Sequence, residues 1–142
     1  QWRPRDIHVE AAVANGRHRL TYHFFEEPAM NTFDAELARQ RQQDRGGLLR
    51  TLAMETTPLA EILDRHLPPG QLIDFLSVDV EKFEMDVLKS NDWAKYRPRI
   101  ILAECLDQDL MSLPSDPVVH YLGDQGYTPI ARTIRTTIFK SR

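Results

Sequence analysis

The fold of this chain is decided by one stretch, Ile73-Asp74-Phe75-Leu76-Ser77-Val78-Asp79-Val80-Glu81-Lys82-Phe83-Glu84-Met85-Asp86-Val87-Leu88. Its first half is a run of strand-forming apolar residues, which predicts a strand buried on both faces of a parallel sheet. After Glu81 the apolar residues Phe83, Val87 and Leu88 recur at helical spacing. A buried strand is therefore expected to end at the carboxylates of Asp79 and Glu81, with a helix following. In open α/β sheets, ligands bind beyond the carboxyl ends of the strands.

A second apolar run follows this helix. Residues 99–103 predict a buried strand that ends at Glu104. A strand, a helix and a second strand form a βαβ unit, in which the two strands are parallel and the crossover is right-handed. Because the carboxyl ends of neighbouring parallel strands lie at the same sheet edge, Asp79 and Glu104 are expected to open into one crevice.

The remaining segments predict further strands and helices around this unit. Residues 6–14 and 20–25 read as a hairpin turning at Asn15-Gly16, and residues 127–131 and 136–140 read as a second hairpin. Residues 48–56 predict a short strand. Helices are expected over 33–43, capped by Asn31 or Thr32, from Pro58 to about Leu67, and over 117–125. Together these elements predict an α/β domain.

Composition sets the broad class of the protein. The 142 residues are 42% hydrophobic and 27% charged, which is typical of one globular domain. A net charge of −3 gives no broad basic face for nucleic acid, and no apolar run is long enough for a membrane span. The single cysteine, Cys105, cannot form an internal disulfide and fits a reducing compartment, so we expect a cytoplasmic protein.

Several ordered motifs surround the central stretch. It is followed by Asn91-Asp92-Trp93, Tyr96-Arg97-Pro98 and Ile100-Ile101-Leu102-Ala103-Glu104, and preceded by Arg3-Pro4-Arg5-Asp6-Ile7, Glu10-Ala11-Ala12-Val13 and Glu27-Pro28-Ala29-Met30-Asn31-Thr32-Phe33. In this order they resemble the later part of the FkbM family of S-adenosylmethionine-dependent methyltransferases. That family typically carries a strand ending in Asp-Val-Glu-Gly. Here Lys82 stands in place of the glycine, and we expect this departure to alter the loop.

The resemblance implies a fold and a cofactor. The fold would be a Rossmann-like methyltransferase fold, with a mostly parallel sheet and a carboxyl-terminal antiparallel hairpin, and the cofactor would be S-adenosylmethionine. None of the six glycines forms the Gly-x-Gly turn on which such cofactors usually lie. We therefore expect residues 1–142 to be a single, apparently truncated methyltransferase domain that represents the carboxyl-terminal part of the fold. A partial sheet would expose an apolar edge, through which a homo-oligomer is expected.

The candidate catalytic residues are Asp79, Glu81 and Glu104. Methyl transfer to oxygen requires an acceptor held in line with the methyl donor and a group that accepts its proton, which a carboxylate such as Asp79 provides. Clustered carboxylates also suit a hard divalent cation. Three acids do not define a metal geometry, so we expect direct hydrogen bonding and no metal. The alternative is that the acids only solvate strand ends and, with Glu84, complement the dipole of the following helix.

The resemblance also implies binding residues. Glu10, Ala11 and Ala12 would lie beside the adenine of the cofactor, and Asn31 and Thr32 would line the acceptor side of the site. The structural alternatives are a plain strand end for the first group and a helix-capping turn for the second. The expected partner is a small-molecule acceptor that is methylated on a hydroxyl, which belongs to a small molecule or to a sugar. Neither nucleic acid nor a membrane is expected as a partner.

Two functions from different classes follow from these observations. The first is an enzyme, the carboxyl-terminal part of an S-adenosylmethionine-dependent O-methyltransferase. The second is a non-catalytic, methyltransferase-like interaction module, which the missing glycine turn and Lys82 favour. Cofactor binding distinguishes the two functions.

Overall fold

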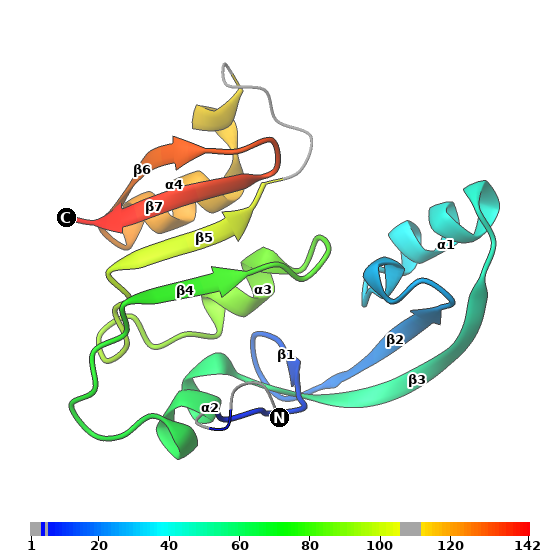
Figure 1. Cartoon of the computed structure of the whole chain (residues 1–142), viewed down its shortest axis with the longest axis horizontal. Coiled ribbons are helices and arrows are strands. Elements are labelled where there is room, and N and C mark those ends of the chain that lie inside the picture. The colour runs from blue at the N-terminus through cyan, green and yellow to red at the C-terminus, as the bar shows by residue number, and fades with distance from the viewer. Residues whose placement is uncertain (1–3, 5, 106–111) are drawn as a thin grey trace.

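A computed structural model describes residue 4 and residues 6–105 and 112–142 (Figure 1). Helices and strands alternate over most of this length, and the strands form two sheets. The elements are β1 (Ala12–Val13), β2 (Arg19–Phe25), η1 (Pro28–Met30), α1 (Ala35–Asp44), β3 (Leu48–Thr57), α2 (Leu59–His66), β4 (Phe75–Val78), α3 (Glu84–Lys89), β5 (Ile100–Glu104), η2 (Leu113–Ser115), α4 (Pro117–Asp124), β6 (Tyr127–Arg132) and β7 (Thr136–Ser141). The predicted α/β class is confirmed.

The larger sheet has the strand order β4-β5-β7-β6. Strands β4 and β5 are parallel, with Phe75 opposite Ile100 and Val78 opposite Ala103. They are joined through α3, so the predicted βαβ unit is confirmed. Strands β6 and β7 form the predicted carboxyl-terminal antiparallel hairpin, and β7 also pairs antiparallel with β5. This arrangement places the carboxyl ends of β4 and β5 side by side.

The smaller sheet has the order β1-β3-β2 and differs from the prediction. Strand β2 pairs antiparallel with β3, and the two form a long curved ribbon that reaches away from the larger sheet, with α1 beside its far end (Figure 1). The predicted hairpin between residues 6–14 and 20–25 is wrong, because β1 pairs with β3 in parallel. The buried side chain of Thr56 explains the change. Its hydroxyl accepts the His18 N–H at 2.9 Å and donates to the Gly16 carbonyl at 2.8 Å, which fixes β3 between β1 and β2.

Strand β4 is less buried than its apolar sequence predicts. It forms the edge of the larger sheet, and Phe75 is 65% exposed while Val78 is buried. A strand buried on both faces needs a layer packed against each face of its sheet. Leu76 and Val78 pack against the core, whereas Phe75 and Ser77 on the opposite face are exposed, so the prediction of a doubly buried strand is wrong here.

A mostly parallel, Rossmann-like sheet is not confirmed. Among the described residues, the parallel pairs are β1–β3 and β4–β5, whereas β2–β3, β5–β7 and β6–β7 are antiparallel. The fold is therefore a mixed α/β arrangement of two sheets.

The helices begin close to their predicted positions but with different caps. Helix α1 is capped by Asp34, whose carboxylate accepts the Leu37 N–H at 2.7 Å. The prediction that Asn31 or Thr32 caps it is wrong, because both side chains bond elsewhere. No helix in the described part of the chain is both long enough and apolar enough to cross a membrane.

The core lies between the larger sheet and helices α3 and α4. Trp93 anchors it, since its indole N–H lies 3.1 Å from the Leu88 carbonyl and 3.0 Å from the Tyr121 hydroxyl. Tyr127 is fully buried and donates its hydroxyl to the Pro98 carbonyl at 2.7 Å. These bonds tie the connections after α3 and α4 to the sheet, and so fix the strand ends that carry the acids.

Candidate functional site

The loop after β4 has an unusual backbone. Glu81 and Lys82 have φ angles of 53° and 75°, which place both in the left-handed region. For residues with a Cβ this conformation costs roughly 1–2 kcal/mol each, whereas glycine adopts it freely. Lys82 is the residue that stands where the FkbM pattern has glycine. The structure therefore gives a physical reason for the glycine, and the loop here adopts the turn without it.

Lys82→Gly is expected to stabilise the protein by about 0.5–1 kcal/mol, because relief of the left-handed strain exceeds the added entropy of an unfolded glycine. Urea-induced unfolding measures this difference. Lys82→Ala is the matched control, since it removes the same amine and keeps the Cβ. Equal stability of the two variants would show that backbone strain at this position is negligible.

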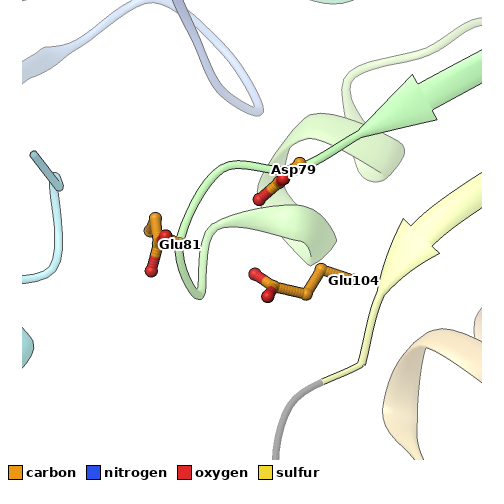
Figure 2. Close-up of side chains that lie close together, drawn as sticks. All are labelled: Asp79, Glu81 and Glu104. Carbon is orange, nitrogen blue, oxygen red and sulfur yellow. The ribbon is translucent and has the colours of Figure 1, made fainter. Parts of the chain in front are cut away.

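Three carboxylates meet where β4 and β5 end (Figure 2). Asp79 directly follows β4, Glu81 lies in the loop before α3, and Glu104 is the last residue of β5. One oxygen from each lies within 4.8 Å of the other two. The structure thus brings together all three candidate catalytic residues, as the parallel pairing of β4 and β5 requires.

Glu104 is the most buried of the three. It is 9% exposed, and its buried Oε2 has no hydrogen-bond partner among the residues that the structure describes. Burial, followed by repulsion from Asp79, Glu81 and Glu84, raises the pKa of Glu104 to about 7, while Arg135 acts in the opposite direction. The ionised form of the Glu104 carboxylate is therefore disfavoured at this position.

Glu84 lies next to this cluster and is only 6% exposed. Its carboxylate accepts the Val80 N–H at 3.1 Å, which closes the loop onto the first turn of α3. Burial raises the pKa of Glu84, and the nearby Asp79 adds to the effect. Glu84 therefore does more than complement the dipole of α3, because its hydrogen bond to Val80 also holds the shape of the loop.

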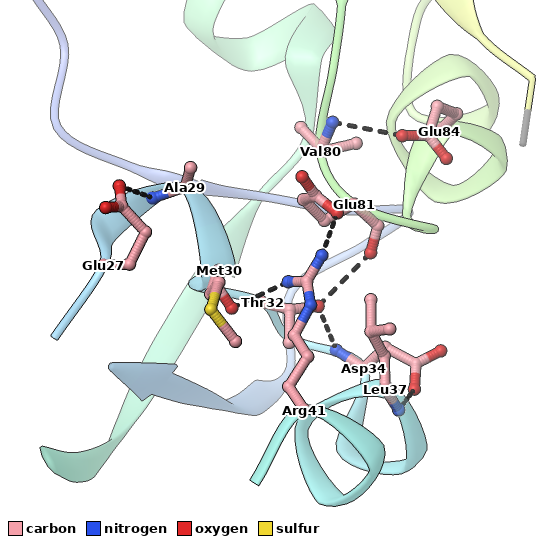
Figure 3. A network of polar contacts seen from close by, with 10 residues as sticks. All are labelled: Glu27, Ala29, Met30, Thr32, Asp34, Leu37, Arg41, Val80, Glu81 and Glu84. Carbon is pink, nitrogen blue, oxygen red and sulfur yellow. Dashed lines mark hydrogen bonds and ion pairs between the residues drawn. The ribbon is translucent and has the colours of Figure 1, made fainter. Parts of the chain in front are cut away.

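Arg41, on α1, connects α1 and η1 to the loop after β4 (Figure 3). Its guanidinium forms an ion pair with Glu81 and donates to the Met30 carbonyl at 2.7 Å. The two paired side chains are 18% and 26% exposed, so the pair is shielded better than a typical surface pair. Arg41 thereby orients Glu81 and holds α1 and η1 against the loop.

Asn31 and Thr32 have structural bonds of their own. The Asn31 side-chain oxygen accepts the Phe25 N–H at 2.8 Å. Thr32 is 2% exposed, and its hydroxyl donates to the Glu81 carbonyl at 3.2 Å and accepts the Asp34 N–H at 3.0 Å. The Thr32 hydroxyl therefore already donates one hydrogen bond and accepts another within the protein. Asn31 keeps its amide nitrogen free of hydrogen bonds within the described chain.

A cavity of about 690 Å³ connects most of the predicted site residues. Its lining includes Glu10 and Ala11 from the predicted cofactor group, Asn31 and Thr32 from the predicted acceptor group, and the catalytic candidates Asp79 and Glu81. Ala12 does not line it and is buried in β1. Glu104 is also absent from the lining and approaches Asp79 and Glu81 from the side of β5.

The cavity also has an aromatic wall that the sequence analysis missed. Tyr22, Phe24, Phe33 and Phe83 line it. The Tyr22 ring lies 4.7 Å from Phe24 and 4.6 Å from Phe33, between ring centres. Residues two apart on a strand point to the same face, so the Tyr22-x-Phe24 spacing is a signal that would have predicted part of this wall.

An α/β fold with acids at adjacent strand ends beside a large cavity is the arrangement of a ligand-binding enzyme domain. Comparison with family models specifies the class: the model described as "Methyltransferase FkbM domain" matches residues 3–128. The chain therefore belongs to the FkbM methyltransferase family, and the resemblance seen in its motifs is confirmed. Neither the curated proteins nor the solved structures gave a match.

Proposed function

We propose that this domain transfers a methyl group from S-adenosylmethionine to a hydroxyl oxygen of a small molecule or sugar, in the cavity beside Asp79. The observation that carries the proposal is the composition of the cavity lining. Three segments were predicted separately to bind the cofactor, to bind the acceptor and to catalyse the transfer. All three line the same cavity, through Ala11, Asn31 and Asp79 respectively. These segments are far apart in the sequence, so their meeting does not follow from local structure.

The lining suits the cofactor. A volume of about 690 Å³ lies within the range of roughly 300–1,000 Å³ that is usual for ligand sites. Ala11 leaves room for a ring, Tyr22 and Phe24 supply aromatic faces, and the Glu10 carboxylate is an acceptor for the hydroxyl or amine groups of an adenosine. Because the sequence has no Gly-x-Gly turn, the proposal is limited to the part of the cofactor that this cavity encloses.

The carboxylates suit the acceptor. When bound, S-adenosylmethionine supplies a methyl group activated by a positively charged sulfur. Asp79 would accept the hydroxyl proton as the acceptor oxygen takes the methyl group, whose bond to sulfur would break. The products are the methyl ether and S-adenosylhomocysteine. Asp79 lines the cavity and is exposed to it, so it reaches an acceptor directly.

We also propose that the β4-β5-β7-β6 sheet belongs to a Rossmann-like methyltransferase fold and that residues 1–142 act as one domain. The family membership and the βαβ unit of β4, α3 and β5 support this assignment. In such folds the ligand lies beyond the carboxyl ends of the parallel strands, where Asp79 and Glu104 lie.

Calorimetric titration with S-adenosylhomocysteine tests the proposal. The wild-type chain is expected to bind about one equivalent. Ala11→Leu is expected to weaken binding about tenfold or more, because the larger side chain occupies space in the cavity that the ligand needs. A tenfold loss of affinity corresponds to about 1.4 kcal/mol of binding free energy. Ala94→Leu, at an exposed position outside the cavity lining, is the matched control. Absence of binding by the folded chain, or equal binding by Ala11→Leu, would contradict the proposal.

A non-catalytic interaction module is the second candidate. The exposed Phe75 on the edge strand β4 favours it, because an apolar sheet edge is suited to pairing with another chain. Under this alternative, Phe75→Lys lowers the oligomer fraction in sedimentation velocity, and the chain does not bind S-adenosylhomocysteine. Binding of S-adenosylhomocysteine by the wild-type chain would contradict this alternative.

A further inference from the structure

We propose that Asp79, Glu81 and Glu104 bind one hard divalent cation, Mg²⁺ or Ca²⁺, at the carboxyl ends of β4 and β5. From the sequence alone, these acids are predicted to act by direct hydrogen bonding, without a metal. The arrangement of the side chains favours a cation instead. The proposed cation site depends only on these three carboxylates. Its role in methyl transfer rests on the function proposed above.

The separation of the oxygens fits a shared ion. One oxygen from each carboxylate lies within 4.8 Å of the others. Ligands on opposite sides of a Ca²⁺ ion are at most about 5 Å apart, because each bond is about 2.3–2.6 Å long. For Mg²⁺, with bonds of about 2.0–2.1 Å, the limit is about 4.2 Å, which a small side-chain rotation provides. Both ions prefer carboxylate oxygens, and water or an acceptor in the cavity can complete the coordination.

Glu104 gives an independent indication of a missing ligand. It is 9% exposed, and Oε2 is buried without any hydrogen-bond partner in the described chain. Figure 2 shows its carboxylate directed towards Asp79 and Glu81. A buried carboxylate oxygen without a hydrogen-bond donor is strongly unfavourable. A cation between the three residues would provide the missing partner.

The surrounding charges leave the cluster negative. Glu84 adds a fourth carboxylate close to Glu104. Two arginines oppose them: Arg41 forms an ion pair with Glu81, and Arg135 acts on Glu104 through its charge at longer range. Arg41 bonds to Oε2 of Glu81, and Oε1 has no ion-pair partner among the described residues. When all four carboxylates are ionised, the two arginines leave an excess of negative charge that one divalent ion would offset.

The position of the cluster suggests what the cation would do. Asp79 and Glu81 line the cavity, so an ion held between them and Glu104 would lie at its wall. A hydroxyl that binds such an ion has a lowered pKa, and its oxygen becomes a better nucleophile. The ion would also fix the acceptor oxygen in one place relative to the methyl donor.

Calorimetric titration of the chelator-treated chain with MgCl₂ and with CaCl₂, without cofactor, tests the site. At least one of these ions is expected to bind at about one equivalent, with a Kd of about 1 mM or tighter, as in weaker Ca²⁺ sites. Glu104→Gln and Asp79→Asn each remove a ligand, and each is expected to weaken binding about tenfold or more. Asp86→Asn, an acid-to-amide change on α3 outside the cluster, is the matched control and should bind like the wild type.

A second variant separates a cation site from an acid cluster that Arg41 alone neutralises. Arg41→Gln frees the Glu81 carboxylate, so cation affinity is expected to rise severalfold. The proposal is overturned if neither ion shows saturable binding to the folded wild-type chain, or if Glu104→Gln binds as the wild type does. These outcomes are independent of the S-adenosylhomocysteine titration, so a failed cation site leaves the proposed methyl transfer intact, and the converse also holds.

Discussion

Asp79→Asn is expected to lower kcat/KM for methyl transfer about 100-fold or more, the usual contribution of a positioned general base. The amide keeps the size of the side chain but does not accept the hydroxyl proton, and it is a weaker ligand for any cation. Because Asp79 lines the cavity at its acidic end, the binding of S-adenosylhomocysteine should change by less than about twofold. The rate is measured as transfer of tritium-labelled methyl from S-adenosylmethionine to the acceptor.

The control for this prediction is Asp86→Asn, which makes the same chemical change on α3. It should retain the wild-type rate. A normal rate for Asp79→Asn would remove this residue from the mechanism. A rate loss matched by an equal loss of S-adenosylhomocysteine affinity would instead indicate that Asp79 holds the cofactor.

Glu104→Gln is expected to stabilise the protein at neutral pH and to have no effect on stability in acid. The pKa of Glu104 is raised from 4.5 to about 7 in the folded chain, mainly by burial and then by Asp79, Glu81 and Glu84. Below pH 4.5 both the folded and the unfolded chain hold the proton. Between pH 4.5 and 7 the unfolded chain loses its proton first, so the wild type loses stability, up to about 3 kcal/mol. Above pH 7 the loss is constant.

This difference is measured by urea unfolding of both proteins from pH 4.5 to 8 in the presence of EDTA. The gain from Glu104→Gln should grow with pH and then level off. Glu55→Gln, an exposed change on β3, is the control and should show no such trend. A constant difference across the pH range would mean that Glu104 is not destabilised by its buried charge. A further comparison adds a divalent cation in place of EDTA. Stabilisation of the wild type by the cation, without a change in the stability of Glu104→Gln, would agree with the cation site.

The part of the fold that the sequence predicted well is local. The change from an apolar run to helical spacing at Glu81 located β4 and α3, and the second apolar run located β5 and its final acid, Glu104. Two parallel strands joined by a short helix have few alternatives, so the meeting of Asp79 and Glu104 followed from these signals. The terminal hairpin followed from two strand-forming runs around a short turn.

The parts that failed depend on contacts between distant segments. The apolar run of β4 indicates burial, but its neighbours decide how much of it is covered, and Phe75 remains exposed at the sheet edge. Asn15-Gly16 is a strong local hairpin signal, yet β3 is long enough to pair with all of β2. The hydroxyl of Thr56, more than thirty residues away, then separates β1 from β2.

The site was predicted in its acids and missed in its surroundings. Arg41 lies in a polar helix that gives no sign of which partner it meets, and only the folded chain places it against Glu81. Phe33 and Phe83 come from different segments, so their shared cavity wall depends on the same tertiary contact. The burial of Glu84 was also not predicted, because an acid in the first turn of a helix is usually exposed.

A crystal structure of the chain with bound S-adenosylhomocysteine tests the central claim most directly. We expect the ligand in the cavity between Ala11 and Asp79, with its adenine towards Ala11 and the aromatic wall, and its sulfur towards Asp79. That position would allow an acceptor held by Asp79 to reach the methyl group. A ligand bound outside this cavity, or one with its adenine against Asp79 and its sulfur away from the acids, would contradict the account.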